Sequence, residues 1–288
     1  MLEWQIGDVK ISAIVEMTVS GDNEFVLPDA KNELCKEIAW LQPHFMDSDG
    51  FLIFVIQAFV VDTGERRIVV DTCVGNDKDT GVPGWDLLQT SFLSDMEAAG
   101  YPADSIDTVL CTHLHVDHVG WNTMLVDGNW VPTFKNARYL AARKEWEHWS
   151  KYEDDPNFDN VMSQSIRPIF DAGLLDTVES EHQICPEVSL EPTPGHTPGH
   201  VSVVISSQGQ RALITGDSIH HPCQMTRPEW YSSADSDPEQ AYSTRKALLE
   251  KYADTDVLLF GSHFPAPTGG HVRRLEEEGR YWFDTGSN

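Results

Sequence analysis

The sequence predicts a mixed α/β fold, because strand-like and helix-like segments alternate along the chain. Two apolar runs over residues 51–62 and 67–71 are separated by Thr63-Gly64-Glu65-Arg66, a sequence typical of a hairpin turn. Apolar residues at helical spacing over 87–99 are then followed by a glycine that indicates a helix end. A further apolar run at 108–111 gives the order hairpin, helix, strand, which favours an α/β arrangement.

The remaining elements extend this pattern on both sides. Residues 9–15 are expected to form the first strand, whereas residues 16–50 show no clear period and indicate a long loop with short helical pieces. Such long loops are uncommon without a function, so this segment is either a cover over a pocket or a surface excursion that buries its own aromatic residues. Further strands are predicted over 138–142, 188–190, 201–206, 211–215 and 257–260, and further helices over 144–149, 161–172 and 238–251.

The C-terminal part offers fewer signals. Residues 257–260 are expected to form the last buried strand, and the acidic run Glu276-Glu277-Glu278 is interpreted as one solvated face of a helix. No low-complexity linker or break in composition divides the chain. We therefore expect one domain over residues 1–288, with 16–50 as its pocket-covering segment.

The charge of the chain excludes some partners. A formal net charge of −26 at 288 residues repels polyanions, so neither nucleic acid nor an anionic membrane surface is expected as a partner. The 40% hydrophobic content suffices for a sizeable core. The oligomeric state is left open, with a homodimer as one of the assemblies considered.

The cysteines and the N-terminal residues bear on the compartment. Five scattered cysteines without a Cys-x-x-Cys pair suit free buried thiols in a reducing environment. The start, Met1-Leu2-Glu3-Trp4-Gln5, lacks the features of a signal peptide, and the apolar run at 51–61 is too short to span a bilayer. A soluble cytoplasmic protein is the expectation.

The sharpest motif is Thr112-His113-Leu114-His115-Val116-Asp117-His118, directly after the strand-like run 108–111. Four metal-capable side chains within six residues at a strand end predict a site for zinc or a related divalent metal. The alternative is a polar turn that happens to be rich in histidine.

Three further candidates for ligands lie next to predicted strands. His196 precedes the strand 201–206, Asp217 follows the strand 211–215, and His263 follows the strand 257–260. Glycine or other small residues beside each of them would let the backbone bring the side chain close to a shared centre. A site with two metal ions needs such additional ligands.

Together, His-x-His-x-Asp-His, the Gly195-His196-Thr197-Pro198-Gly199-His200 turn, Gly216-Asp217 and Gly261-Ser262-His263 resemble the metallo-β-lactamase fold hydrolases. Within that superfamily the chain looks closest to dinuclear-zinc lactonases of acyl-homoserine lactones and to related phosphotriester and aryl-ester hydrolases. The resemblance implies a four-layer αβ/βα sandwich of two mixed sheets. It also implies hydrolysis of a lactone or ester bond by a hydroxide that bridges two divalent metal ions, with zinc as the expected metal.

The resemblance also implies a role for each candidate residue. It assigns one metal to His113, His115 and His196 and the other to Asp117, His118 and His263, with Asp217 bridging both. Asp71 would support the ligand loop from behind, although a carboxylate that caps a turn is an equal alternative. His200 would make a structural hydrogen bond in its turn. Asp117 would orient the nucleophile.

One position departs from the lactonase pattern. Where those enzymes carry a tyrosine three residues after the bridging aspartate, this chain has His220, which we interpret as a partner of the leaving group or of the oxyanion. The substrate is expected to be a small, largely apolar molecule, since aromatic and sulfur-containing residues flank the ligand segments. The residues expected to contact it are Trp121, Met124, Phe45, Met225 and His220.

Several rival functions are less favoured. A phosphotriester or aryl-ester hydrolase is the main alternative. A β-lactamase would require an export signal, a glyoxalase II-type thioesterase a basic patch for its substrate, and a nuclease a less acidic chain. Redox members of the superfamily use iron, and a non-catalytic scaffold would be expected to have lost ligands. All seven ligand positions are present here.

Overall fold

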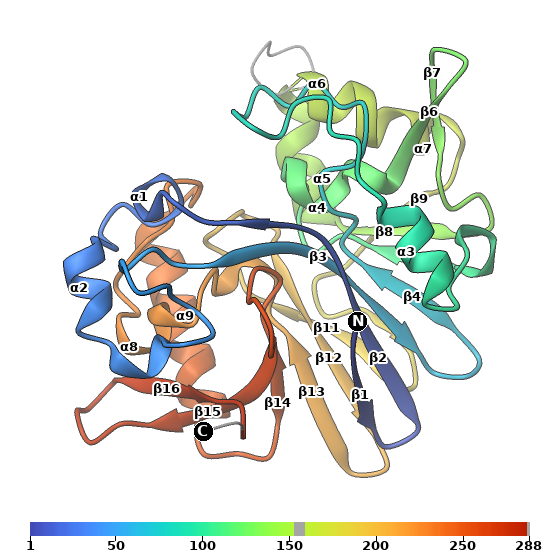
Figure 1. Ribbon diagram of the computed structural model, residues 1–288. Coiled ribbons are helices and arrows are strands. Elements are labelled where there is room, and N and C mark those ends of the chain that lie inside the picture. The colour runs from blue at the N-terminus through green and yellow to red at the C-terminus, as the bar shows by residue number, and fades with distance from the viewer. Residues whose placement is uncertain (153–158, 287–288) are drawn as a thin grey trace. The chain divides into compact units, whose positions relative to one another are not determined.

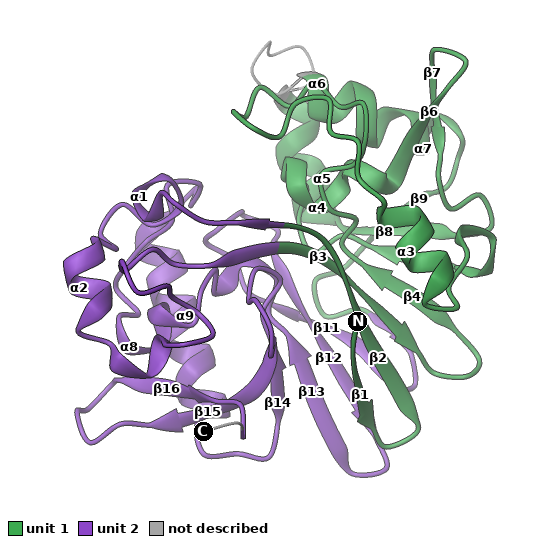
Figure 2. Ribbon diagram, viewed as in Figure 1, with its two compact units in different colours: residues 1–17, 56–182 green, residues 18–55, 183–288 purple. Residues whose placement is uncertain are grey.

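The computed structural model describes residues 1–152 and 159–286. The chain forms two compact units (Figure 2): unit 1 is made of Met1–Met17 and Ile56–His182, and unit 2 of Thr18–Val55 and Gln183–Asn288. Each unit is built around one seven-stranded mixed sheet (Figure 1). The predicted α/β class with two mixed sheets is therefore confirmed.

Unit 1 contains the N-terminal hairpin, the strands that precede the ligand loop and the helices that follow it. The strands are β1 (Leu2–Ile6), β2 (Val9–Val19), β3 (Phe54–Asp62), β4 (Arg67–Val70), β5 (Thr108–Leu110), β6 (Thr123–Val126), β7 (Asn129–Pro132), β8 (Arg138–Ala142) and β9 (Leu175–Val178). The helices are α3 (Phe92–Ala98), α4 (Val116–Val119), α5 (Arg143–Trp149), α6 (Asp159–Val161) and α7 (Arg167–Asp171), with a π-helix, η5 (Met162–Ile166), and short 3₁₀ turns η2 (Ala103–Ser105), η3 (Gly120–Asn122) and η4 (Ser150–Tyr152).

The strand order in unit 1 brings several strand ends to one edge. The sheet runs β1-β2-β3-β4-β5-β8-β9, and β6 and β7 form a separate hairpin. Strands β4, β5 and β8 are parallel, with Val70 paired to Leu110 and Leu110 paired to Leu140. The segments that follow these three strands therefore leave the sheet at the same edge, as parallel strands require. Asp71 and the predicted ligand loop both lie there.

The core of unit 1 explains why its segments fold as they do. Alternate residues of β3, namely Ile56, Ala58 and Val60, pack with Phe92 and Met96 of α3 in one apolar cluster. The two-residue period of the strand and the helical spacing of α3 thus point their apolar side chains at each other. Helix α3 begins later than the predicted residue 87, since Leu87 has a left-handed backbone with φ of 52°.

Unit 2 contains the second sheet and most of the long N-terminal segment. Its strands are β10 (Gln183–Cys185), β11 (Val188–Pro192), β12 (Val201–Ser207), β13 (Gln210–Ile214), β14 (Leu258–Phe260), β15 (Gly269–Arg274) and β16 (Tyr281–Asp284). Its helices are α1 (Asn23–Val26), α2 (Asn32–Lys36), α8 (Cys223–Thr226) and α9 (Pro238–Tyr252), with 3₁₀ turns η1 (Ala39–Leu41) and η6 (Gly216–Ser218).

The second sheet also gathers its candidate ligands at one edge. The strand order follows the chain from β10 to β16, and β13 and β14 are parallel, with Ile214 paired to Phe260. Strand β12 is antiparallel to β13, and its Val203 pairs with Ile214, so β12 begins where β13 ends. The segments before β12, after β13 and after β14 therefore meet at one edge.

The first residues of the long segment 16–50 are not a loop, because β2 continues to Val19. From Thr18 onward the segment belongs to unit 2, and part of it packs into the core of that unit. After β2 it forms the short helices α1 and α2, and its residues Leu27, Leu41 and Phe45 join Leu249 and Tyr252 of α9 in one apolar cluster. The prediction of short helical pieces is confirmed. Its predicted role as a pocket cover, and the assignment of residues 1–288 to one domain, stay predictions.

Two C-terminal predictions are wrong. Residues 257–260 do not form the last buried strand, because β15 and β16 follow and bury Val272, Tyr281 and Phe283. The run Glu276-Glu277-Glu278 is not helical but lies exposed in the turn between β15 and β16. Register pairs such as Arg274 with Tyr281 close this hairpin.

The state of the cysteines agrees with a further expectation. Cys35, Cys73, Cys111, Cys185 and Cys223 are all free and buried, as predicted. Among the described residues, none of the helices has both the length and the apolar character needed to cross a membrane.

Candidate metal-binding site

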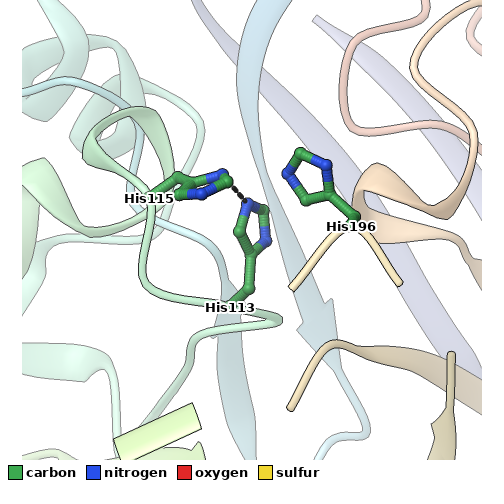
Figure 3. Close-up of side chains that lie close together, drawn as sticks. All are labelled: His113, His115 and His196. Atoms are coloured by element: carbon green, nitrogen blue, oxygen red, sulfur yellow. Dashed lines mark hydrogen bonds between the residues drawn. The ribbon is translucent and has the colours of Figure 1, made fainter. Parts of the chain in front are cut away.

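The ligand loop of unit 1 connects β5 to the single turn of α4. His113 and His118 are buried, while His115 and Asp117 are partly exposed. His113 Nε2 and His115 Nδ1 lie 3.1 Å apart, the contact marked by the dashed line in Figure 3. Figure 3 also draws His196, which belongs to unit 2. The tight turn after β5 thus directs ring nitrogens of neighbouring histidines toward each other.

Asp71 supports this loop from the end of β4. Its Oδ1 accepts the Thr112 backbone N–H at 2.8 Å, and its Oδ2 contacts the Thr112 hydroxyl at 2.9 Å and His118 Nδ1 at 2.9 Å. Asp71 adopts a left-handed backbone, with φ of 57°, which few residues tolerate without strain. With Nδ1 of His118 held by Asp71, a metal would bind this histidine through Nε2.

A second set of contacts holds the segment that follows the ligand loop. The Gly120 N–H donates to the Cys73 carbonyl at 2.7 Å, and a Cβ on Gly120 would stand only 1.7 Å from the Val74 carbonyl oxygen. No larger residue fits this crossing of two backbones. Glu16 in β2 fixes the same place, because its carboxylate accepts the Val74 N–H at 2.8 Å and the Trp121 indole N–H at 2.7 Å.

Glu145 supports the loop from α5. This fully buried carboxylate accepts the Leu114 N–H at 3.1 Å and the Trp149 indole N–H at 2.6 Å. Leu114 stands between His113 and His115, so Glu145 fixes the backbone that carries both. Sequence reasoning missed Glu16 and Glu145, since neither lies in a recognisable motif.

The residues of unit 2 that are predicted as metal ligands are His196, Asp217 and His263. His196 Nε2 lies 3.4 Å from Asp217 Oδ2, and His263 Nε2 lies 3.1 Å from Asp217 Oδ1. Asp217 belongs to η6 directly after β13, His263 follows β14, and His196 precedes β12. The edge of the second sheet thus brings all three predicted residues of this unit together.

Each of the two histidines has its other ring nitrogen bound to oxygen. His196 Nδ1 lies 2.8 Å from Asp235 Oδ1, and His263 Nδ1 lies 2.9 Å from the Val55 carbonyl oxygen. These contacts place the ring proton on Nδ1, so a metal would bind each of these histidines through Nε2. Asp235 was missed by sequence reasoning because it lies within the loop between α8 and α9 and not at the end of a strand.

Arg245 in α9 organises the loop that carries Asp235. This fully buried guanidinium donates to the Ser218 carbonyl at 3.0 Å and to the Trp230 carbonyl at 3.0 Å. Its Nη2 lies 3.8 Å from Asp235 Oδ2. Burial lowers the pKa of Arg245, whereas the nearby Asp235 carboxylate raises it. Arg245 therefore links the residue next to Asp217 with the partner of His196.

His200 and His220 flank Asp217 in different ways. His200 Nε2 accepts the Asp217 backbone N–H at 2.9 Å, and its Nδ1 lies 2.8 Å from the Thr193 hydroxyl. His220 Nε2 lies 3.3 Å from Asp217 Oδ2. His200 therefore holds the backbone of Asp217, while His220 faces its carboxylate.

The residues predicted to contact the substrate differ in exposure. Trp121 is buried and stacks on Phe92, with ring centroids 5.8 Å apart, and Met124 is partly exposed. Phe45 and Met225 are buried in the apolar core of unit 2, where the Phe45 ring packs edge-on against His221. Among these four residues, Met124 is thus the one whose side chain is partly exposed to solvent.

The donors in each unit fit a divalent metal. A tetrahedral ion with metal–ligand distances of about 2.1 Å places neighbouring donor atoms about 3.4 Å apart. The separations within the units are 3.1 Å for His113 and His115, 3.4 Å for His196 and Asp217, and 3.1 Å for His263 and Asp217. Neutral imidazoles fixed by oxygen acceptors, together with carboxylates, are donors that zinc and similar ions prefer.

Comparisons with known proteins agree with this chemistry. The chain is similar to the N-acyl homoserine lactonase AiiA of Bacillus thuringiensis subsp. kurstaki, with 27% identity over 221 residues that cover 72% of this chain and 80% of the relative. It is also similar to a protein of Mycobacterium tuberculosis named a probable metallo-hydrolase, with 24% identity over 272 residues that cover 83% and 84%.

Solved structures with the same fold include hydrolases and lactonases. The hydrolase AbOPH of the beta lactamase superfamily matches with a TM-score of 0.79 and 26% identity, covering 98% of this chain and 96% of that one. The dizinc quorum-quenching lactonase AidC matches with a TM-score of 0.78 and 22% identity, covering 99% and 98%. The second likeness shows the fold alone.

The family model described as the metallo-beta-lactamase superfamily matches residues 53–263. This range includes strands from both sheets and all seven residues predicted as metal ligands. The chain is therefore a metal-dependent hydrolase that belongs to the metallo-beta-lactamase superfamily.

Proposed function

We propose that this enzyme hydrolyses a lactone or ester bond in a small, largely apolar molecule with the help of two divalent metal ions. The observation that supports this most directly is the complete set of seven histidine and aspartate ligands. In His118, His196 and His263 the ring nitrogen Nδ1 is already fixed by an oxygen atom. Such fixed imidazoles are typical of metal ligands rather than of isolated surface histidines.

The sequence pattern of the superfamily supplies the assignment of ligands. One ion would be held by His113, His115 and His196, and the other by Asp117, His118 and His263, with Asp217 shared between them. Zinc is the expected ion, although manganese, cobalt and iron bind similar donors. Bound there, two such ions would lower the pKa of water to about 7 and polarise the bond to be cleaved.

The protein's own side chains would orient the reactants. Asp117 is partly exposed next to buried His118, and its carboxylate would orient the attacking hydroxide and carry its proton onward. His220 would donate a hydrogen bond to the substrate oxygen that develops charge. Trp121, Met124, Phe45 and Met225 would provide the apolar contacts, with partly exposed Met124 as the first to test.

Lactone hydrolysis has the support of a relative. The Bacillus thuringiensis protein whose match covers 72% of this chain is named an N-acyl homoserine lactonase. A phosphotriester or aryl-ester hydrolase is the second candidate, since His220 stands where the lactonases resembled here carry a tyrosine. An imidazole differs from a phenol in reach and in pKa, which would favour a different substrate oxygen.

The test combines metal content with a substrate panel. Protein purified without added metal would be measured by mass spectrometry and assayed with an acyl-homoserine lactone, a γ-lactone, an aryl ester, a phosphotriester and a β-lactam. About two metal ions per chain with lactone turnover is the expected result. Turnover of only the aryl ester or the phosphotriester would select the second candidate.

A matched pair of variants controls this assay. His113→Ala removes a proposed ligand, whereas His182→Ala changes a histidine outside both ligand sets. We expect the first variant to lose metal and turnover and the second to keep both. Less than one metal ion per wild-type chain, with no turnover after zinc is added, would overturn the proposal.

A further inference from the structure

His220 is buried in unit 2 and is only 2% exposed. Among the residues that the structure describes, neither its Nδ1 nor its Nε2 has a hydrogen-bond partner. Buried polar atoms in proteins nearly always have a partner, so such an atom calls for a physical explanation. An imidazole that loses its bound water on burial and gains no hydrogen bond in exchange destabilises the folded state.

The neighbouring residue shows how the same turn satisfies a histidine. His221 is also fully buried, but its Nε2 lies 2.9 Å from the Phe45 carbonyl oxygen and its Nδ1 accepts the Cys223 N–H at 3.1 Å. Burial lowers the pKa of His221 to about 3, so this ring is neutral and structural. His220 has no such bonds, although it lies in the same short segment.

The backbone of His220 is nevertheless held in place. Buried Gln224 accepts the His220 N–H through its Oε1 at 2.7 Å and donates from its Nε2 to the Trp230 carbonyl at 2.8 Å. These two hydrogen bonds fix the backbone of the turn after β13, and this backbone directs the His220 imidazole toward Asp217. Its ring centroid lies 4.7 Å from that of His196.

The donor atoms around His220 have the spacing of metal ligands. His220 Nε2 and His196 Nε2 lie 3.3 Å and 3.4 Å from the same Asp217 Oδ2, and one donor atom from each of the three residues lies within 4.8 Å of the others. Donors of a tetrahedral zinc site stand about 3.4 Å apart. The 3.3 Å contact of His220 with Asp217 does not have hydrogen-bond geometry.

We propose that His220 is itself a metal ligand, which completes with His196 and Asp217 a three-donor set for a divalent cation within unit 2. The inference rests on the proposed function, since it adds a ligand to a metal of that site. An Nε2 that binds a metal carries no proton to donate. His220 would therefore bind the metal in the enzyme without substrate. For Nε2 to donate a hydrogen bond to the substrate, the His220 ring would first have to leave the metal.

Two substitutions separate ligation from hydrogen bonding. His220→Gln keeps a side-chain N–H donor but is a poor ligand, and His220→Phe keeps an aromatic ring but has no donor atom. His271→Phe, at a partly buried histidine of β15 in the same unit, is the control. Zinc affinity would be measured by chelator competition without substrate, and the visible absorption spectrum would be recorded with cobalt.

Both His220 variants are expected to bind one of the two ions at least about tenfold more weakly, since loss of outer partners alone costs 10–100-fold. Their cobalt spectra should change, while the control keeps the wild-type affinity and spectrum. Wild-type affinity and spectrum in both His220 variants would overturn the inference, and a lower kcat in that case would leave only the hydrogen-bonding role. A wild-type chain that binds no metal would overturn the proposed function as well.

A measurement on the unaltered protein avoids any dependence on how the variants fold. Protein loaded with cadmium-113 should show scalar coupling between the metal and the nitrogen-15 nucleus of His220 Nε2, as for His196. Coupling to His196 without coupling to His220 would contradict the inference and leave the proposed function intact.

Discussion

The contact between His196 and Asp235 gives a histidine that we propose as a metal ligand a buried carboxylate partner. The Asp235 side chain has no exposed surface, and its Oδ1 lies 2.8 Å from His196 Nδ1. We expect Asp235→Asn to weaken zinc binding by about 10- to 100-fold, because the neutral amide makes the imidazole a weaker base and fixes its tautomer less well. Chelator competition with purified protein measures this change.

Asp237→Asn is the control for Asp235. Asp237 lies two residues further along, is exposed, and caps α9 by accepting the Gln240 N–H at 3.0 Å. Asparagine is an equally good N-cap, so neither zinc affinity nor stability should change. Equal zinc affinity in both variants would show that Asp235 has no influence on the metal site.

The candidate ligands could be named from the sequence, but most of their partners could not. His113, His115, Asp117 and His118 stand within six residues, so their spacing alone marks them as candidates. Asp235 lies 39 residues from His196, and Glu16 lies 105 residues from Trp121. Such pairs form only when the chain folds and brings distant segments together. A single acidic residue in a loop belongs to no spacing pattern that would identify it in the sequence.

At the scale of elements, Glu16 ties β2 to the turn after β4 and to the segment after α4. Glu16→Ala would leave the N–H groups of Val74, Gly75 and the Trp121 indole without their acceptor. Since each buried group left unpaired costs about 1–3 kcal/mol, we expect the free energy of unfolding to fall by at least about 2 kcal/mol. Urea denaturation gives this value.

Amide exchange distinguishes a local effect from a general one. The amides of Val74 and Gly75 should exchange faster in Glu16→Ala, because their hydrogen bonds are lost. Glu65→Ala, in the exposed turn between β3 and β4, should leave both amides and the stability unchanged. Unchanged protection of Val74 and Gly75 in Glu16→Ala would contradict the proposed tie.

Lys78 joins the loop after β4 to β6 and to the π-helix η5. Its buried Nζ donates to the Thr123 hydroxyl at 2.6 Å and to the Gln164 carbonyl at 3.1 Å, and lies 3.6 Å from the centre of the Trp130 ring. Burial lowers the pKa of Lys78 from 10.5 to about 6, because the charged form is poorly hydrated there.

This pKa predicts a pH dependence of stability. Between about pH 6 and 10.5 the unfolded chain binds a proton at Lys78 that the folded chain does not, so the contribution of Lys78 to the free energy of unfolding rises with pH. Lys78→Met should therefore become less stable relative to wild type as the pH rises from 6.5 to 9.5. Exposed Lys135→Met should show no such trend. A constant difference between wild type and Lys78→Met would contradict the lowered pKa.

The elements predicted from the sequence were those with strong periodic or turn signals. Strand β8 (Arg138–Ala142) and the helix α9 after its Asp237 cap agree with prediction. The hairpin of β6 and β7 and the strands β15 and β16 were missed, because their four to six residues mix polar and apolar types. Backbone pairing with neighbours, rather than local propensity, makes these segments strands.

At the scale of the whole molecule, metal binding should contribute to stability. Ions that bind only the folded chain stabilise it by about 4 kcal/mol each when present at 1,000 times their Kd. The formal charge of −26 also makes the acidic side chains of the folded chain repel one another, and bound cations would offset this repulsion. A chelator should therefore lower the melting temperature of the wild-type protein, and added zinc should restore it.

The double variant His113→Ala, His263→Ala tests whether this stabilisation comes from the proposed ligands. It removes one proposed ligand from each unit, so its melting temperature should respond little to a chelator or to zinc. The control is the double variant Lys135→Ala, Glu65→Ala, which changes two exposed residues. Its melting temperature should respond to the chelator and to zinc as that of the wild type does. If the chelator shifts both variants equally, the stabilising metal is bound elsewhere. If wild type melts at the same temperature with and without the chelator, the folded chain does not gain stability from metal.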